Sequence, residues 1–260
     1  MLQPERTVVL NLEETAIERV IPHRRGHVLS SSSRGGARDQ MHERITRGES
    51  HGHLTLVACV AADADLQRRC PQFVLTKDAS LTARERARMS ALASPIQWFS
   101  GTSGWVTKEN FPAILTALRR FLRQRRPGFE YVIVLDCAAQ HVANDVLAHA
   151  ARLGLHLLFV PARLTFLLQP LDTHVFSTLK LQLHREQLRA RSGAAQGGLG
   201  PLEWIAILER TVTQVLVMRD WSRSFADNGV TGRPELARPR ILEQAGVVLP
   251  HLGGHQQMLN

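Results

Sequence analysis

The stretch YVIVLDCAAQHVANDVLAHAARLGLHLLFV, residues 131–160, decides the fold. It begins with an apolar run that has no polar alternation, which is typical of a strand buried on both faces. Apolar residues from Val142 to Leu153 then recur with helical period, and Gly154 stands where a helix would end. Residues 155–160 form a second apolar run. Strand, helix and strand in this order predict a βαβ crossover with two parallel strands.

Three shorter segments ahead of this unit also read as strands. They are TVVLNL at 7–12, a strand within HLTLVACVAADAD at 53–65, and QFVLT at 72–76. All three are rich in β-branched residues, which favours an antiparallel meander. We therefore expect an α/β protein whose mixed sheet joins a three-strand antiparallel meander to parallel strands, with helices on both faces.

The remaining segments are mostly helical or polar. Residues 111–126 form an amphipathic pattern with a basic end, and helical patterns follow from Pro170 to 192 and beyond the Gly-rich break near 193. We expect a core at 1–192 that includes a basic loop at 23–50. A C-terminal helical extension at 193–232 and a poorly ordered tail at 233–260 complete the expected organisation.

Charge and composition narrow the class of protein. The 260 residues include 32 basic and 23 acidic side chains, which gives a formal net charge of +9. A positive field of this kind is the usual footprint of a polyanionic partner such as nucleic acid. No apolar run is long enough to span a membrane, and the three cysteines lack metal-type spacing. We therefore expect a soluble intracellular protein with reduced thiols.

Acidic residues stand at positions that this fold would bring together. Asp136 ends the first strand of the βαβ unit, and Asp172 opens the helix after its second strand. Glu13 and Glu14 stand at the end of the first strand of the chain. Ligands bind at the carboxyl ends of parallel strands, and clustered carboxylates repel unless cations lie between them. Hard oxygen ligands of this kind suit two Mg²⁺ or Mn²⁺ ions about 4 Å apart at a phosphodiester.

Each of these residues also has an ordinary structural explanation. An aspartate before a helix is often a turn or capping residue, as Asp136 would be, and Asp172 would favourably meet a helix dipole. His141 has the character of a core or surface histidine as much as of a site residue. The other histidines lack paired ligand spacing, so a structural zinc site is not expected; those considered are His23, His27, His42, His51 and His53.

A longer pattern makes the combination specific. The segment 134–183 resembles the core of the DDE-superfamily endonuclease domain in pogo-type transposases, which are related to the mariner group. That family has a strand ending in Asp-Asn, a His a few residues on, a strand ending in Pro, a Thr, and Gln-Pro-Leu-Asp opening a helix. The corresponding residues here are Asp136, His141, Pro161, Thr165 and the run 169–172.

The resemblance extends outward less sharply, over roughly residues 7–230. Residues 11–15 are similar to the family's first-strand motif of Asn, an apolar residue, Asp, Glu and Thr. Segments 53–65, 103–111 and 221–230 resemble its second strand, its Gly-Trp segment and a helix beyond the catalytic core.

The resemblance implies an RNase H-like fold and metal-dependent cleavage and transfer of DNA strands. It implies that Glu13, Asp136 and Asp172 are the catalytic residues and hold two Mg²⁺ or Mn²⁺ ions. Further residues are expected to line the site or, from their charge, to bind DNA. The expected lining residues are Glu14, His141 and Gln169, and the expected DNA-binding residues are Arg119, Arg120, Arg123 and Lys180.

Departures from the family pattern bear on activity. Glu13 stands where the family has its first catalytic aspartate, which adds one methylene group. Cys137 replaces the usual Asn, and Ala139 replaces a usual Pro. The chain begins almost at the first strand, so the family's helix-turn-helix region ahead of the catalytic domain is not expected here. The basic loop at 23–50 is longer than expected for the family.

Three functional hypotheses follow. The first is a transposase-derived DDE endonuclease domain, in which Glu13 at the first acid position could impair activity. The second is a domesticated, non-catalytic DNA-binding protein that retains the fold, and the third is a basic protein-interaction module. DNA is the expected partner, a homodimer is left open, and neither a membrane nor a small-molecule cofactor is expected. The expected location is nuclear in a eukaryote and cytoplasmic otherwise.

Overall fold

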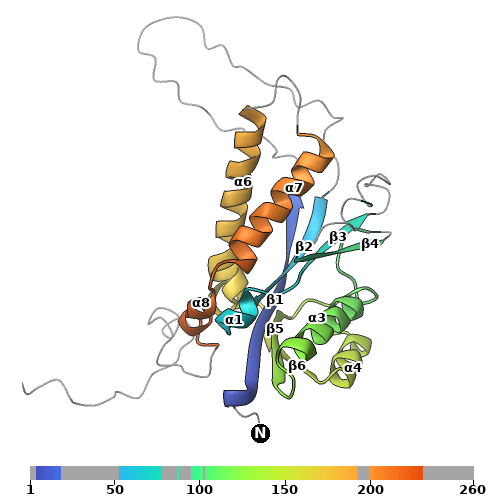
Figure 1. Cartoon of the computed structure of the whole chain (residues 1–260). Coiled ribbons are helices and arrows are strands. Elements are labelled where there is room, and N and C mark those ends of the chain that lie inside the picture. Colours follow the sequence, from blue (N-terminus) through green and yellow to red (C-terminus); the bar gives the residue numbers. More distant parts are fainter. Residues whose placement is uncertain are drawn as a thin grey trace, which may run out of the picture.

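The structure, a computed structural model, describes residues 4–18, 53–77, 87, 95–101, 103–192 and 199–230 (Figure 1). The expected basic loop at 23–50 and the expected tail at 233–260 lie outside the described residues. The strands are β1 (Thr7–Glu18), β2 (His53–Ala61), β3 (Gln72–Lys77), β4 (Ile96–Gly101), β5 (Glu130–Asp136) and β6 (Leu155–Val160).

Helices connect these strands and extend the chain beyond them. The α-helices are α1 (Ala64–Gln67), α3 (Phe111–Arg125), α4 (Asn144–Arg152), α5 (Thr165–Leu168), α6 (Phe176–Ser192), α7 (Pro201–Val212) and α8 (Ser222–Asp227). A short 3-10 helix, η1 (Pro4–Arg6), precedes β1, and there are two π-helical turns, η3 (Leu171–Val175) and η4 (Thr213–Val217).

The six strands form one mixed sheet in the order β4-β3-β2-β1-β5-β6. β2 runs antiparallel to both β1 and β3. β5 runs parallel to β1 and to β6. The predicted three-strand meander and the predicted parallel pair are therefore confirmed. This is the strand order and direction of the RNase H-like fold, with β4 added parallel to β3 at one edge.

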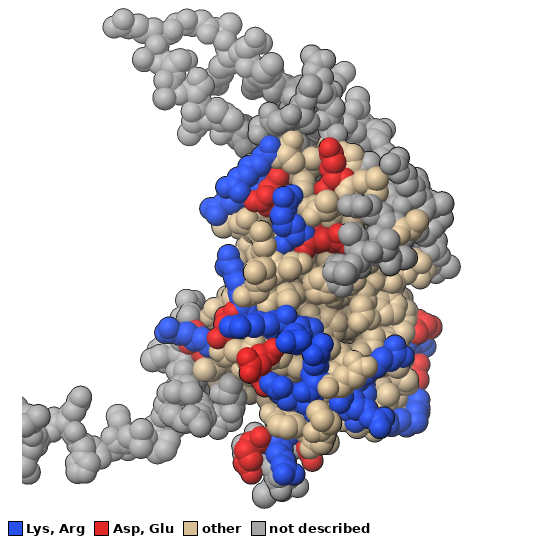
Figure 2. All heavy atoms as spheres, in the orientation of Figure 1, with Lys and Arg blue, Asp and Glu red and all other residues tan. Residues whose placement is uncertain are grey.

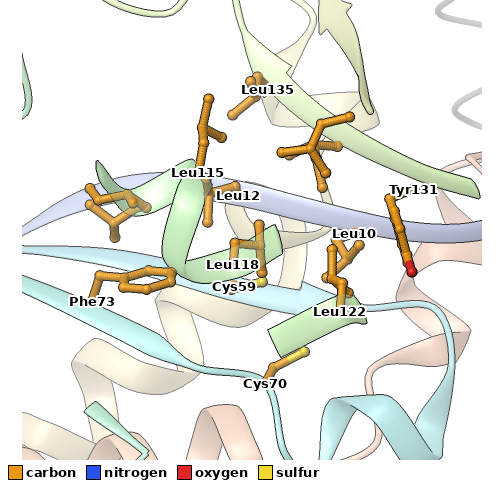
Figure 3. Packing of buried hydrophobic residues seen from close by; sticks show 14 of the residues in the cluster. Leu10, Leu12, Cys59, Cys70, Phe73, Leu115, Leu118, Leu122, Tyr131 and Leu135 are labelled. Carbon is orange, nitrogen blue, oxygen red and sulfur yellow. The ribbon is translucent and has the colours of Figure 1, made fainter. Parts of the chain in front are cut away.

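Helices cover both faces of the sheet, as predicted. One hydrophobic core lies between the sheet and α3 and α4, and contains Leu10, Leu12, Phe73, Leu118 and Leu135 (Figure 3). The second core lies on the opposite face, between the sheet and the helices η3, α6, α7, η4 and α8. Side chains alternate along a strand, so β1 sends Val8, Leu10 and Leu12 to the first core and Ile17 to the second.

β1 is longer than predicted, and this changes the position of the two glutamates. The strand continues to Glu18 because its antiparallel pairing with β2 runs as far as His53. Its parallel pairing with β5 stops at Asn11. Glu13 and Glu14 therefore lie within β1, where it separates from β5, and the prediction that they stand at the end of the strand is wrong.

β4 was not predicted from the sequence. Its residues, IQWFSG, carry no clear alternation, and only Ile96 among them is fully buried. Pairing with β3 over six residue positions, from Gln72 opposite Ile96 to Lys77 opposite Gly101, forms the strand. Tertiary pairing thus decides a segment whose local pattern is weak.

Candidate active site

Glu13 and Asp136 come from neighbouring strands of the sheet. The parallel register of β1 and β5 places Asn11 opposite Val134. Glu13 and Asp136 each follow this last pair by two residues, and the charge of Asp136 helps to raise the pKa of Glu13. Both lie on the face opposite the core that contains Leu12 and Leu135, since side chains alternate along a strand. The parallel pairing of β1 and β5 ends at Asn11 and Val134, before these two residues.

Asp172 comes from η3, and the pKa shifts of Glu13 and Asp172 show charge interactions among Asp172, Glu13 and Asp136. The side chain of Asn11 is completely buried and holds this turn in place. Its Nδ2 donates to the carbonyl of Val134 at 3.1 Å, and its Oδ1 accepts from the backbone N–H of Leu171 at 2.9 Å. Asn11 therefore ties together β1, β5 and the turn that carries Asp172. π-Helical turns are rare and are often found at functional sites.

The three acids interact electrostatically. Burial raises the pKa of Glu13 to about 8, and the charges of Asp136, Glu14 and Asp172 contribute to the rise. The pKa of Asp172 is raised by desolvation and by the charge of Asp136, against the effect of a hydrogen bond from Thr165. Glu13, Asp136 and Asp172 are thus close enough to disfavour one another's ionisation, as expected of carboxylates gathered at one site.

Glu13 has an unfilled hydrogen-bonding position. One carboxyl oxygen, Oε1, accepts from the backbone N–H of Glu14 at 3.1 Å. The other, Oε2, is buried and has no hydrogen-bond partner. A buried polar atom without a partner costs free energy, so its presence requires an explanation such as an ion or water. A divalent cation between Glu13 and Asp136 would fill this position and offset the repulsion.

His141 is buried and links Asp136 to Glu14. Its Nδ1 is 2.6 Å from Oδ1 of Asp136, and its Nε2 is 2.8 Å from Oε1 of Glu14. Ionised carboxylates only accept hydrogen bonds, so both ring nitrogens donate and the imidazole is cationic. Burial alone lowers the pKa of His141, but the two carboxylates outweigh it and raise the pKa to about 10.

Asp136 is the acid most favoured to ionise. Burial raises its pKa, but the hydrogen bonds from His141 and from the backbone N–H of Ala138 bring the pKa below its ordinary value. Cys137, which stands where the family has Asn, points elsewhere and donates from Sγ to the carbonyl of Val160 at 3.2 Å. The Cys at position 137, in place of the family's Asn, therefore does not disturb the hydrogen bonds of Asp136 with His141 and Ala138.

The donor set suits a hard cation, although it is not already closed around one. Across the described ranges, no group of three or more His, Cys, Asp or Glu side chains is arranged to hold a metal ion. The physical reason is that Asp136 and Glu14 turn toward His141, and Glu13 bonds its own neighbouring backbone. The unpartnered oxygen of Glu13 and the mutual repulsion of the acids nevertheless fit a divalent ion bound through carboxylate oxygen.

The other expected site residues have mixed environments. Gln169 is completely buried, and neither its side-chain oxygen nor its nitrogen has a hydrogen-bond partner. Lys180 is exposed and its charge lowers the pKa of Asp172. Arg120 and Arg123 are exposed on α3. Arg119, in contrast, donates from Nε to the carbonyl of Leu153 at 2.5 Å and lies over the Tyr131 ring, so it is engaged within the protein.

Two residues that position the site were not chosen from the sequence. Asn11 anchors the turn of Asp172, and Thr165 at the start of α5 donates a hydrogen bond to the carboxylate of Asp172. Both were part of the quoted family motifs, so a signal was present. Their roles depend on contacts between segments far apart in the chain, and sequence spacing does not reveal such contacts.

The family comparison agrees with this geometry. A family model described as "DDE superfamily endonuclease" matches residues 53–210. The chain belongs to this family. The six-stranded mixed sheet is the fold that the sequence motifs predicted for this family. No curated protein matches the sequence significantly.

Several solved structures resemble the DDE domain at low identity. The Mos1 strand transfer complex is 14% identical, covers 94% of this chain and 56% of that chain, and has a TM-score of 0.48. The mariner Mos1 paired end complex with Mg is 17% identical, covers 87% and 56%, and has a TM-score of 0.40. The catalytic domain of Mos1 mariner transposase is 14% identical, covers 87% and 83%, and has a TM-score of 0.40.

The DDE domain spans only 56% of the length of the Mos1 chains in these two complexes. As for membranes, the described part of the chain contains no helix that is both long and apolar enough to cross a bilayer.

Proposed function

We propose that this DDE domain cleaves DNA strands with divalent cations held by Glu13, Asp136 and Asp172. The observation that carries the proposal is the buried, unpartnered oxygen of Glu13, whose pKa is raised in part by the charge of Asp136. Asp172 lies on the turn held by Asn11, and its charge contributes to the raised pKa of Glu13. Carboxylates gathered where two parallel strands separate can hold the divalent ions that metal-dependent phosphodiester chemistry requires.

When bound, Mg²⁺ or Mn²⁺ at such a site would activate a water or hydroxyl and stabilise the leaving oxygen of a phosphodiester. The chain's own residues prepare this site. Asp136 is held ionised by His141 and by its own turn, so it is available as a ligand at neutral pH. Thr165 and Lys180 both favour the charged form of Asp172.

DNA as the substrate is supported by charge as well as by family. The chain has a formal net charge of +9, and in the view of Figure 2 Lys and Arg side chains gather over the lower part of the molecule, where α3 and α4 lie in Figure 1. Lys and Arg side chains that contact DNA phosphates give affinity without recognition of the base sequence. We infer that the domain binds duplex DNA with little sequence preference and that binding weakens steeply with salt.

A second candidate is a DNA-binding protein that retains the fold but does not cut. It is favoured by two observations: Glu13 carries one methylene more than the family's aspartate, and no described group of acids is closed around an ion. Misplacement of a catalytic group by about 1 Å can reduce the rate about a hundredfold. The two candidates differ in their response to metal and to a shorter residue at position 13.

The test is nicking of supercoiled DNA with Mn²⁺ or Mg²⁺ by the wild type, Asp136→Asn and Glu13→Asp. We expect metal-dependent nicking by the wild type, loss of nicking with Asp136→Asn, and an increase of up to about a hundredfold with Glu13→Asp. Asp145→Asn, a change at an exposed aspartate in α4, serves as the matched control and should cut like the wild type.

The affinity of the same proteins for duplex DNA is measured at several salt concentrations. Asp136→Asn should still bind DNA, with an affinity that falls as the salt concentration rises. If Asp136→Asn nicks with the full metal response, Asp136 is only a turn residue and the catalytic proposal is wrong. If only Glu13→Asp cuts, the second candidate is correct.

A further inference from the structure

The two adjacent glutamates of β1 have different surroundings. Glu13 lies on the face that carries Asp136 and Asp172. Glu14, the next residue, has its side chain on the opposite face, where its Oε1 meets Nε2 of His141 at 2.8 Å. The side chain of Glu14 is 16% exposed, and that of His141 is 1% exposed. A hydrogen bond between charged groups in such a dry environment is strong and fixes direction.

His141 has little freedom to turn. Its ring packs against Phe111, with the two ring centroids 4.6 Å apart. Its backbone N–H donates to the carbonyl of Ala138 at 2.9 Å. The ring is therefore held by an apolar contact on one side and by carboxylates at both nitrogens. Because one nitrogen contacts Glu14 and the other contacts Asp136, the ring links the placement of these two side chains.

Asp136 is held through one oxygen only. Oδ1 accepts from Nδ1 of His141 at 2.6 Å and from the backbone N–H of Ala138 at 3.1 Å. Among the described residues, no group donates a hydrogen bond to Oδ2 of Asp136. The protein thus fixes Oδ1 and leaves Oδ2 without a donor among the described residues.

We infer that Glu14 and His141 are positioning residues: Glu14 holds His141, and His141 holds Oδ1 of Asp136 so that Oδ2 is presented to a cation. The inference rests on the proposed function of the site. It separates the roles of the two glutamates, because Glu13 would be a ligand and Glu14 would act only through His141. Partners that orient a metal ligand in this way typically contribute about 10- to 100-fold in metal affinity or activity.

The same pair of residue types occurs elsewhere on the sheet without burial. Glu130 begins β5, and its Oε2 lies 3.1 Å from Nε2 of His156 on β6. Both side chains are about half exposed, at 46% and 55%. Exposed ion pairs of this kind contribute little to the stability of the fold. Glu130 therefore provides a matched control for the removal of a glutamate that contacts a histidine.

The experiment measures Mn²⁺ affinity by electron paramagnetic resonance for the wild type, Glu14→Ala, Glu14→Gln and Glu130→Ala. Glu14→Ala should weaken Mn²⁺ binding about 10- to 100-fold. Glu14→Gln should stay near the wild type, because its amide oxygen can still accept from Nε2. Glu130→Ala should also stay near the wild type. Glu14→Asp, which withdraws the oxygen, is the second loss variant should Glu14→Ala fail to fold.

A second measurement, made without metal, reports how accessible His141 is to a reagent. Acylation of His141 by diethyl pyrocarbonate, followed by mass spectrometry of the peptide, should be slow in the wild type and in Glu14→Gln. It should be faster in Glu14→Ala, because Nε2 loses its partner.

The outcomes separate this inference from the proposed function. If the wild type binds Mn²⁺ and all three Glu14 variants bind it equally well, the positioning role is wrong while the metal site stands. If Glu14→Gln loses as much affinity as Glu14→Ala, Glu14 is itself a ligand and the inference is overturned. If the wild type binds no Mn²⁺, the proposed function fails and this inference fails with it.

Discussion

Glu13 is a buried carboxyl group whose surroundings disfavour ionisation. Burial and the neighbouring acids raise its pKa from 4.5 to about 8. Between these two values the folded state retains a proton that the unfolded state has lost, so stability falls as pH rises across this window. The raised pKa of His141, about 10, acts in the same direction between 6.5 and 10.

The corresponding prediction concerns metal-free protein. The free energy of unfolding should decrease between about pH 4.5 and 8, and the decrease should be shallower in Glu13→Gln, which has no carboxyl group to ionise. Urea unfolding at several pH values, in the presence of a chelator, measures both slopes. Equal slopes for the two proteins would show that Glu13 is not the group that titrates.

Single residues also show what a sequence can and cannot predict. Asp136 could be chosen because a carboxylate that ends an apolar strand needs a partner. The contact of His141 with Glu14 spans 127 residues of chain, and nothing in local spacing indicates it. Arg119 looks like the other basic residues of its helix, yet its guanidinium is used to cap α4 at Leu153.

At the scale of elements, the turn η3 determines where Asp172 lies. Asn11 is its anchor, with one hydrogen bond to β5 and one to the first residue of η3. A second support comes from beyond α8, where Oδ1 of Asn228 accepts from the hydroxyl of Thr173 at 3.1 Å. These buried polar contacts give the turn its direction relative to the sheet.

Asn11→Leu should therefore destabilise the protein by about 1–3 kcal/mol, because a backbone N–H and a carbonyl would lose their buried partners. Amide exchange at Leu171 should become faster. Asn144→Leu, at an exposed asparagine in α4, should change stability by less than about 0.5 kcal/mol. Unchanged exchange at Leu171 in Asn11→Leu would mean that the turn is held without Asn11.

Elements differed in how well their patterns predicted them. β5, α4 and β6 were predicted closely because continuous apolar runs and a helical repeat leave few alternatives. The prediction of a helix from Pro170 missed the π-helical turn, since a turn of this kind is imposed by contacts with β1. β1 extends past its expected end because β2 pairs with it, which is a property of two segments rather than one.

At the scale of the whole molecule, the sheet divides the chain into two hydrophobic cores and places the acids where β1 and β5 separate. The alternation of β1 supplies both cores, so one strand connects the helix pair α3 and α4 with the helices on the opposite face. The class of fold followed from the order of strands in the sequence. The opening between β1 and β5 could not be predicted, because it depends on where two different pairings of β1 end.

The most direct test of the account is a crystal structure of the protein with Mn²⁺, in which anomalous scattering locates the ion. The account predicts a peak about 2.1 Å from carboxylate oxygens of both Glu13 and Asp136, with Asp172 at the same ion or at a second one. Its central claim would be contradicted by crystals in saturating Mn²⁺ that show no peak between Glu13 and Asp136, or a peak held by Glu14 and His141 instead.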